Sequence, residues 1–192
     1  MFLENDKYKI KITIDSDFKE ESMNNYDFIF RTIDNENNFK VFRIEVKYDD
    51  KLNILALIGD INSYDENCAV LEDNLLIVLQ NRIITKIDLS ENIVLSVIKT
   101  NNLVYNLGIY RCEGGYIIHG ETNVFKINYD LKEEWSFSGN DIFVTQSGFP
   151  SFVIEKNRIK LHDWNNAYYE LDFDGNLIRN IYADNTDMDF QI

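Results

Sequence analysis

A short unit recurs along the chain: a run of alternating apolar residues, a turn rich in Asp, Asn, Gly and Ser, and a second alternating run. The clearest copies are residues 86–95, 126–135 and 170–179, and a weaker copy covers residues 46–55. Alternating runs joined by such a turn predict β-hairpins. A hairpin that returns every forty-odd residues is typical of repeat proteins built from small antiparallel sheets.

One turn position aligns the four copies. The equivalent residues are Tyr48, Leu89, Tyr129 and Phe173, with spacings of 41, 40 and 44 residues. The best turn of the set lies at residues 174–176, Asp-Gly-Asn, because Gly and Asn accept the positive φ angles that tight hairpins require.

Two further apolar runs precede each hairpin, so each repeat is expected to hold four strands. These runs are residues 8–14, 26–32, 68–71, 75–79, 107–111, 116–118, 142–145 and 152–154. We find no convincing amphipathic helix between them. We therefore predict an all-β protein with a single domain over residues 1–192, whose repeats cover approximately 1–60, 61–100, 101–140 and 141–183.

A small sheet cannot bury both of its faces alone. Stacking several sheets around a shared axis solves this burial problem and leaves only short edges. The sequence therefore predicts about four four-stranded antiparallel repeats in a small or incomplete β-propeller. The alternative is a β-sandwich of related hairpins.

Two segments carry a resemblance to a known class of repeat. Residues 124–130 followed by 134–139, and residues 168–176, show an apolar-x-apolar-Asp/Asn strand and then a turn. They resemble the blades of β-propeller repeat proteins of the WD40, YVTN and quinoprotein-like kinds, although the Gly-His and Trp-Asp dipeptides of WD40 blades are absent. The resemblance implies an architecture rather than an activity, and it implies that ligands bind at loops gathered on one end of the ring.

The chain is strongly acidic, with 19 Lys and Arg against 33 Asp and Glu and a formal net charge of −14. This charge repels nucleic-acid phosphates, so no nucleic-acid partner is expected. It would attract a basic protein and speed the encounter, or it serves only to keep a β-rich chain soluble. No signal-peptide pattern or long uncharged apolar stretch is present, which predicts a cytoplasmic protein with no membrane partner.

The cysteines and the motif search indicate no reactive centre. Cys68 and Cys112 lie 44 residues apart without a CxxC companion, which predicts buried, reduced thiols rather than a zinc site or a disulfide. No pattern for a nucleophile, a phosphate-binding loop or a calcium loop stands out. We therefore predict no catalytic residue, no metal and no cofactor.

His119 and Glu121 are one pair of candidate site residues. In a strand they would point to the same face, a spacing that can orient an imidazole or supply two metal ligands. A third ligand is not visible nearby. The alternative is a histidine satisfied in the core or facing solvent.

His162 and Trp164 form a second candidate pair. Strand alternation would place them on one face and Asp163 on the other, so Asp163 is not expected to orient the imidazole. If that face is exposed, Trp164 is a good contact residue, because tryptophan is enriched at binding hot spots. The alternative is that Trp164 and Trp135 both belong to the core between repeats.

Asp141 is the preferred acidic contact for a partner. It lies in the polar stretch 138–143, which crosses from the third repeat to the fourth. The alternative role is the cap of a loop or turn.

These observations favour a non-enzymatic protein-binding module whose acidic surface captures a basic protein. The sharpest form of this hypothesis is an immunity protein that neutralises a bacterial toxin, present as a monomer or as a heterodimer with its partner. One alternative is an enzyme or small-ligand binder with a site at the propeller axis. Another is a structural repeat subunit.

Overall fold

The computed structural model describes residues 1–32, 39–60, 67–100, 105–145, 148 and 150–182. These residues form seventeen strands and one short 3₁₀ helix, which confirms the all-β prediction. Among them, no helix is long and apolar enough to span a membrane. The chain divides into two compact units, Met1–Arg111 and Cys112–Ile192, and the single domain predicted over 1–192 stays a prediction.

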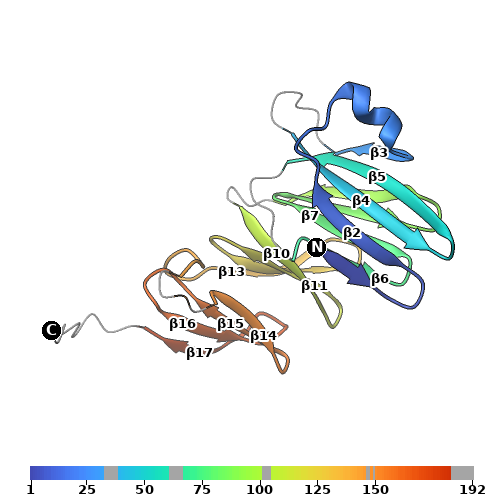
Figure 1. Cartoon of the computed structure of the whole chain (residues 1–192). Coiled ribbons are helices and arrows are strands. Elements are labelled where there is room, and N and C mark those ends of the chain that lie inside the picture. The colour runs from blue at the N-terminus through green and yellow to red at the C-terminus, as the bar shows by residue number, and fades with distance from the viewer. Residues whose placement is uncertain (33–38, 61–66, 101–104, 146–147, 149, 183–192) are drawn as a thin grey trace. The chain divides into compact units, whose positions relative to one another are not determined.

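The strands of the described chain form four separate sheets (Figure 1). The second, third and fourth sheets are four-stranded meanders, in which strands adjacent in sequence are adjacent in the sheet. The second sheet holds β6 (Ala69–Glu72), β7 (Leu75–Gln80), β8 (Ile83–Asp88) and β9 (Ile93–Lys99). The third holds β10 (Asn106–Cys112), β11 (Gly115–Gly120), β12 (Val124–Asn128) and β13 (Glu133–Phe137). The fourth holds β14 (Phe152–Glu155), β15 (Arg158–His162), β16 (Tyr168–Leu171) and β17 (Leu177–Ile181). The predicted four-stranded repeat is confirmed.

The first sheet has one strand more than predicted. Its strands are β1 (Phe2–Glu4), β2 (Lys9–Ile14), β3 (Phe28–Arg31), β4 (Lys40–Tyr48) and β5 (Lys51–Gly59), in the order β1-β2-β4-β5-β3. The 3₁₀ helix η1 (Glu20–Asn25) lies between β2 and β3. Because β4 pairs directly with β2, the apolar run at 26–32 is not the inner meander strand that we expected. It forms β3, which runs parallel to β5 at the edge.

The three aligned hairpins share a β-bulge at the same repeat position. The register of the third strand against the fourth shifts between residues 86 and 87, 126 and 127, and 170 and 171. These steps lie three and two residues before the aligned Leu89, Tyr129 and Phe173. A bulge bends a strand and strengthens its twist. The sequence repeat is therefore also a repeat of backbone geometry.

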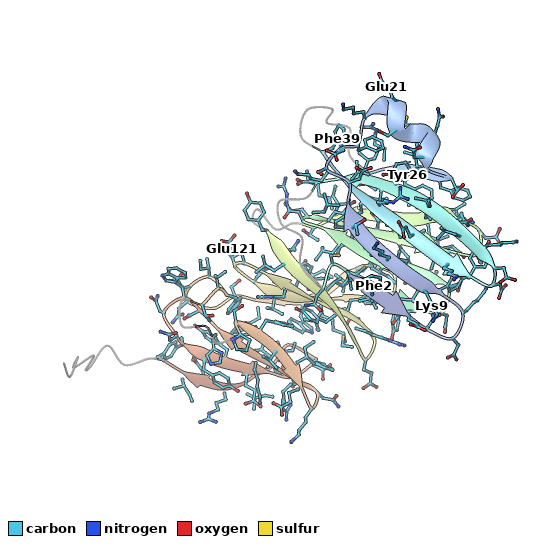
Figure 2. All side chains as sticks on the ribbon, in the orientation of Figure 1. Phe2, Lys9, Glu21, Tyr26, Phe39 and Glu121 are labelled. Atoms are coloured by element: carbon cyan, nitrogen blue, oxygen red, sulfur yellow. The ribbon has the colours of Figure 1, made fainter. Side chains whose placement is uncertain are left out.

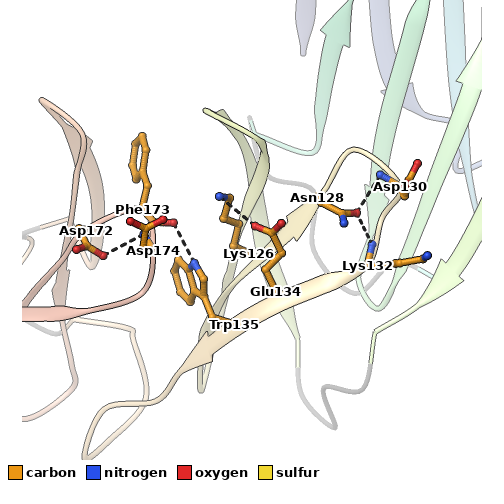
Figure 3. A network of polar contacts seen from close by, with 9 residues as sticks. All are labelled: Lys126, Asn128, Asp130, Lys132, Glu134, Trp135, Asp172, Phe173 and Asp174. Atoms are coloured by element: carbon orange, nitrogen blue, oxygen red, sulfur yellow. Dashed lines mark hydrogen bonds and ion pairs between the residues drawn. The ribbon is translucent and has the colours of Figure 1, made fainter.

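An Asp or Asn side chain closes each of these three hairpins, one residue before the aligned position. Its Oδ1 accepts two backbone N–H groups of the turn, as Figure 3 shows for residues of the third and fourth sheets. The bonds run to Asp88 from Ser90 and Glu91 (2.8 and 3.2 Å), to Asn128 from Asp130 and Lys132 (both 3.0 Å), and to Asp172 from Asp174 and Asn176 (3.0 and 2.8 Å). Turn amides that would otherwise need water are thus satisfied within the chain.

The hairpin of the first sheet, the weakest copy in the sequence, lacks both features. β4 and β5 pair without a shift, and only Asp49 and Asp50 separate the last pair, Tyr48 and Lys51. Lys47 stands where the other repeats have Asp or Asn. A lysine cannot accept turn amides, so this hairpin closes by a two-residue turn instead.

The fourth sheet corrects one predicted strand. Residues 142–145 form no strand, although Phe143 is fully buried in a loop. The remaining strand of this sheet is β15, which is not among the apolar runs predicted for the fourth repeat. The turn before β15 is made by Lys156 and Asn157 with positive φ angles of 49° and 62°, and it contains no glycine that would have marked it.

The first and second sheets pack face to face in the first unit. Fully buried side chains from both sheets form the core, among them Ile12, Ile44, Leu76 and Val78. Each such side chain contributes roughly 1.5–3 kcal/mol of transfer free energy. Cys68 lies in this core and Cys112 is buried in the second unit, and neither cysteine forms a disulfide, as predicted.

The strands β11–β13 of the third sheet and the fourth sheet form a core in the second unit. Trp135 of β13 packs there, and its indole Nε1 donates a 3.0 Å hydrogen bond to the backbone oxygen of Phe173 (Figure 3). Gly175 has a φ of +82°, and a Cβ at this position would lie 2.6 Å from Cδ2 of Trp135. The turn of the fourth sheet therefore needs glycine for its backbone conformation and for the indole of the third sheet.

The outer face of the first sheet, which is turned away from the second, is partly covered by its own chain. Tyr26 packs on Val41 and Ile58, and Phe18 and Phe39 pack beside them. Figure 2 labels Tyr26 and Phe39 near η1. This small cluster covers part of the outer face.

Replacing Asn128 by alanine should destabilise the second unit. The change removes the acceptor of two turn amides, and we expect the free energy of unfolding to fall by about 1 kcal/mol. Asn128→Asp keeps an acceptor oxygen and serves as the control. Urea unfolding of both variants measures the effect, and equal losses for Ala and Asp would show that the side-chain acceptor does not matter.

Candidate functional site

Three of the predicted site residues lie in loops at one end of the second unit. Glu121 lies in the turn from β11 to β12, Trp164 in the turn from β15 to β16, and Asp141 in the connection from β13 to β14. In a meander the turn between the second and third strands shares its end with the exit of the fourth strand. The folding of each repeat therefore gathers these loops, as the sequence could not show directly.

Two backbone hydrogen bonds hold the connection against both turns. Phe143 N donates to Glu121 O at 2.6 Å, and Trp164 N donates to Ile142 O at 2.8 Å. The Phe143 side chain is fully buried in the core between the third and fourth sheets. The connection is therefore held by the burial of the Phe143 ring and by backbone hydrogen bonds to both turns.

Asp141 joins the connection to the turn that carries Trp164. Its Oδ2 accepts a 2.7 Å hydrogen bond from Asn165 Nδ2, and its Oδ1 accepts one from the backbone N–H of Ile142 at 2.8 Å. Trp164 is 40% exposed, whereas Trp135 is core. The alternative of two core tryptophans is thus correct for Trp135 and wrong for Trp164.

Asp163 is the hub of this end, a role that the sequence analysis missed. It is fully buried, and its Oδ1 accepts the backbone N–H groups of Asn165 and Ala167 at 3.0 and 2.9 Å. Its Oδ2 accepts the hydroxyl of Tyr169 at 2.9 Å, and the Tyr169 oxygen in turn accepts the backbone N–H of Asn140 at 3.0 Å. One carboxylate therefore shapes the turn of Trp164 and links it to the connection.

Burial changes the acid–base behaviour of Tyr169. Desolvation, with the hydrogen bond to Asp163 as a smaller cause, raises the pKa of the Tyr169 hydroxyl to about 12. The phenol therefore keeps its proton throughout the ordinary pH range and acts as a permanent donor to Asp163. Its only local signal in the sequence is the Asp-x-x-x-x-x-Tyr spacing, which is too common to be recognised.

His119 is a buried structural histidine. Its side chain is 5% exposed, and its ring stacks on Phe152 with the ring centres 4.7 Å apart. Nε2 lies 3.3 Å from the backbone oxygen of Phe143, which can only accept, so Nε2 carries the proton. Desolvation lowers the pKa of His119 to about 4, which leaves the ring neutral. A partner at the surface cannot contact this side chain.

The two strand-alternation arguments for the candidate pairs are wrong. β11 ends at Gly120 and β15 ends at His162, so Glu121, Asp163 and Trp164 all lie beyond the strands. Side chains alternate between two faces only within a strand, and both strands end before the second residue of each pair. His119 with Glu121, and His162 with Trp164, therefore do not share strand faces as predicted.

His162 occupies the same repeat position as His119 but a different environment. His119 pairs with Val124 and His162 pairs with Tyr168, and these two partners stand at equivalent positions of their repeats. His162 is half-buried, and its ring lies 5.1 Å from that of Tyr168. It lies on the fourth sheet rather than with Asp141 and Trp164 in the loops.

The chemistry offered by these loops is that of a binding surface. It consists of an exposed indole, two carboxylates and the amide of Asn165, in loops that hydrogen bonds join to one another. Within the described ranges no group of three or more His, Cys, Asp or Glu side chains could hold a metal ion. The anchored loops present an aromatic side chain in a fixed position at the rim of an acidic chain.

Comparisons with known proteins concern the fold alone. No protein-family model and no curated protein matches the chain. The computationally designed Ika8 protein aligns with a TM-score of 0.50 and 13% identity, over 77% of this chain and 47% of that one. BamB from Moraxella catarrhalis aligns with a TM-score of 0.48 and 12% identity over 77% and 48% of the two chains, and Hsv2 from Kluyvelomyces marxianus with 0.43 and 10% over 77% and 48%.

The chain thus spans about half the length of these structures. Its fold class follows from its own repeated four-stranded antiparallel sheets, which have the architecture of β-propeller blades. No sheet closes on itself among the described strands. The predicted resemblance to β-propeller repeat proteins is confirmed at the level of architecture.

The burial of His119 predicts a pH-dependent stability. The unfolded chain takes up a proton near pH 6.5, whereas folded His119 does so only near pH 4. Because the unfolded state binds more protons between these values, stability falls as the pH is lowered through this window, by up to about 3 kcal/mol. Full stability returns above pH 6.5.

Urea unfolding between pH 7 and pH 4 checks this effect. His119→Phe should lose the histidine part of the slope, while His162→Phe, at the equivalent but half-buried position, should keep it. The carboxylates contribute the same background in all three chains. A slope unchanged in His119→Phe would contradict the assignment.

The Tyr169 hydroxyl should be needed for the stability of this end. Tyr169→Phe removes the donor to buried Asp163 and the acceptor of the Asn140 amide, which predicts a loss of about 1–3 kcal/mol. Tyr168→Phe, one residue away and half-buried, is the matched control and should cost less. Thermal unfolding of the two variants measures the difference, and equal losses would contradict the proposed hub.

Proposed function

We propose that the chain is a non-enzymatic protein-binding module that captures a basic protein through the loops of its second unit. The observation that carries the proposal is the exposed Trp164, held in place beside Asp141 and Glu121 by the buried carboxylate of Asp163. Aromatic anchors fixed by a rigid framework bind with little loss of side-chain entropy.

The distribution of charge supports a basic partner. In the first unit the hairpin turns carry Asp6, Asp49, Asp50, Asp73 and Glu91 against Lys7 and Arg82. In the second unit they carry Glu113, Glu121, Asp130, Asp163, Asp172 and Asp174 against Lys132 and Lys156. In both units acidic residues outnumber basic ones in the hairpin turns. The resulting negative field steers a basic protein toward the surface of the chain.

In its sharpest form the proposal is an immunity protein that blocks a basic bacterial toxin, such as a nuclease, in the cytoplasm. A toxin of this kind needs positive charge to hold nucleic acid, and an acidic chain can cover that surface. The expected complex is a heterodimer. An enzyme or ligand binder with a site at a propeller axis, and a structural repeat subunit, stay alternative predictions.

Affinity capture from a bacterial lysate tests the proposal. We expect the immobilised chain to retain one basic protein at low salt, and we expect retention to fall steeply in 0.5 M salt because charge steers the encounter. Trp164→Ala combined with Asp141→Ala should abolish retention at low salt.

The matched control is Tyr129→Ala combined with Asp130→Ala, which removes an exposed aromatic ring and a carboxylate from the opposite end of the same unit. This control should retain the partner through the unchanged loops. Retention that is insensitive to salt, or lost equally in both variants, would defeat the proposal.

A further inference from the structure

The first sheet carries a surface unlike the rest of this acidic chain. The cluster around Tyr26 covers part of its outer face, and another part is a shallow hollow of about 600 Å³. Cross-strand partners share a face, and two rows of partners line the hollow. One row consists of Phe2, Lys11 and Glu45. The other consists of Glu4, Lys9, Lys47 and Leu52.

Two large exposed apolar side chains, Phe2 on β1 and Leu52 on β5, flank the charged residues of the hollow. Phe2 is 77% exposed and Leu52 is 55% exposed, more than any other large apolar side chain described in the first unit. Figure 2 shows Phe2 beside Lys9 at the edge of the first sheet. Exposure of two large apolar side chains in one concave patch marks an interaction surface.

Both acidic residues of the hollow are paired, which leaves two of its lysines without an ion-pair partner among the described residues. Glu4 binds Lys9 at 2.9 Å, and Glu45 binds Arg43 at 3.1 Å. Lys11 and Lys47 are exposed and form no ion pair with any described residue. The hollow therefore presents two free ammonium groups on a chain whose net charge is −14.

The spacing of these two lysines matches an extended segment. Lys11 and Lys47 are diagonal neighbours on adjacent strands, because Lys11 pairs with Glu45, two residues before Lys47. Diagonal neighbours lie about 7–8 Å apart. Carboxylates two residues apart in an extended chain are separated by roughly the same distance, about 6.5–7 Å.

We propose that this hollow binds an extended segment of a partner protein whose sheet-facing side chains, at alternate positions, are an apolar residue, two acidic residues and a second apolar residue. The two carboxylates contact Lys11 and Lys47. The apolar side chains on either side of them pack against Phe2, which pairs with Lys11, and Leu52, which pairs with Lys47. This surface is opposite in charge to the one proposed for the basic partner. It goes beyond that function, and either proposal can fail alone.

A labelled peptide tests the site on the full chain. The probe is a fluorescein-labelled synthetic peptide, Phe-Ser-Asp-Ser-Asp-Ser-Leu, whose apolar and acidic side chains share one face when it is extended, and its binding is measured by fluorescence anisotropy. We expect Lys11→Glu combined with Lys47→Glu to weaken binding at least tenfold, and Leu52→Ser to do the same. The same peptide with Asn in place of Asp should bind at least tenfold more weakly.

Matched controls come from the same sheet. Lys40→Glu reverses an exposed lysine at the far end of β4, and Ile29→Ser shortens a 38% exposed side chain on β3. Both should bind the peptide as the unchanged chain does. Capture of the basic partner, measured in parallel, should be the same in all of these variants.

Three results would overturn the proposal. The first is equal peptide affinity for the unchanged chain and the Lys11→Glu, Lys47→Glu variant. The second is peptide-induced amide shifts, in NMR spectra of the ¹⁵N-labelled chain, that fall outside β1, β2 and the β4–β5 hairpin. The third is self-association of the chain, seen by sedimentation and abolished by Leu52→Ser, which would assign the hollow to a second copy.

Discussion

The need of each small sheet to hide an apolar face is the constraint on which the rest of this structure depends. A four-stranded meander has two faces and little thickness, so it cannot exclude water from both. In the first unit the answer is the packing of Ile12 and Ile44 against Leu76 and Val78. In the second unit Trp135 fills the space between the third and fourth sheets, and Gly175 leaves room for it. Packing between consecutive sheets is the logic of a propeller blade.

The same packing shapes the candidate site. The loop from β13 to β14 sends Phe143 into the core, and its backbone then ties down both neighbouring turns. Buried Asp163 satisfies the amides of the turn that exposes Trp164. A buried carboxylate is tolerated because every one of these contacts is a hydrogen bond to a fixed donor. The rigid loops, and the acidic turns around them, are why we favour a binding module for a basic protein.

Particular residues show how far sequence reasoning reached. The alignment of Leu89, Tyr129 and Phe173 predicted the hairpins, and the structure adds a bulge and an Asp or Asn cap at matching positions. The apolar run at 142–145 misled, because burial of Phe143 in a loop looks the same in sequence as burial in a strand. β15 was missed because Lys156 and Asn157 make its turn without glycine or proline. Asp163 was judged by strand alternation, which had already ended at His162.

The sequence by itself determined the local units: alternating strands, hairpin turns, buried cysteines and a net charge of −14. These depend on residues close together in the chain, where periodicity and turn chemistry act directly. Only the tertiary structure decided which equivalent positions are buried. His119 and His162 stand at the same place in their repeats, yet Phe152 of the neighbouring sheet covers one and leaves the other half-exposed. That difference arises from packing between sheets, which brings together residues too distant in sequence for any local pattern to specify.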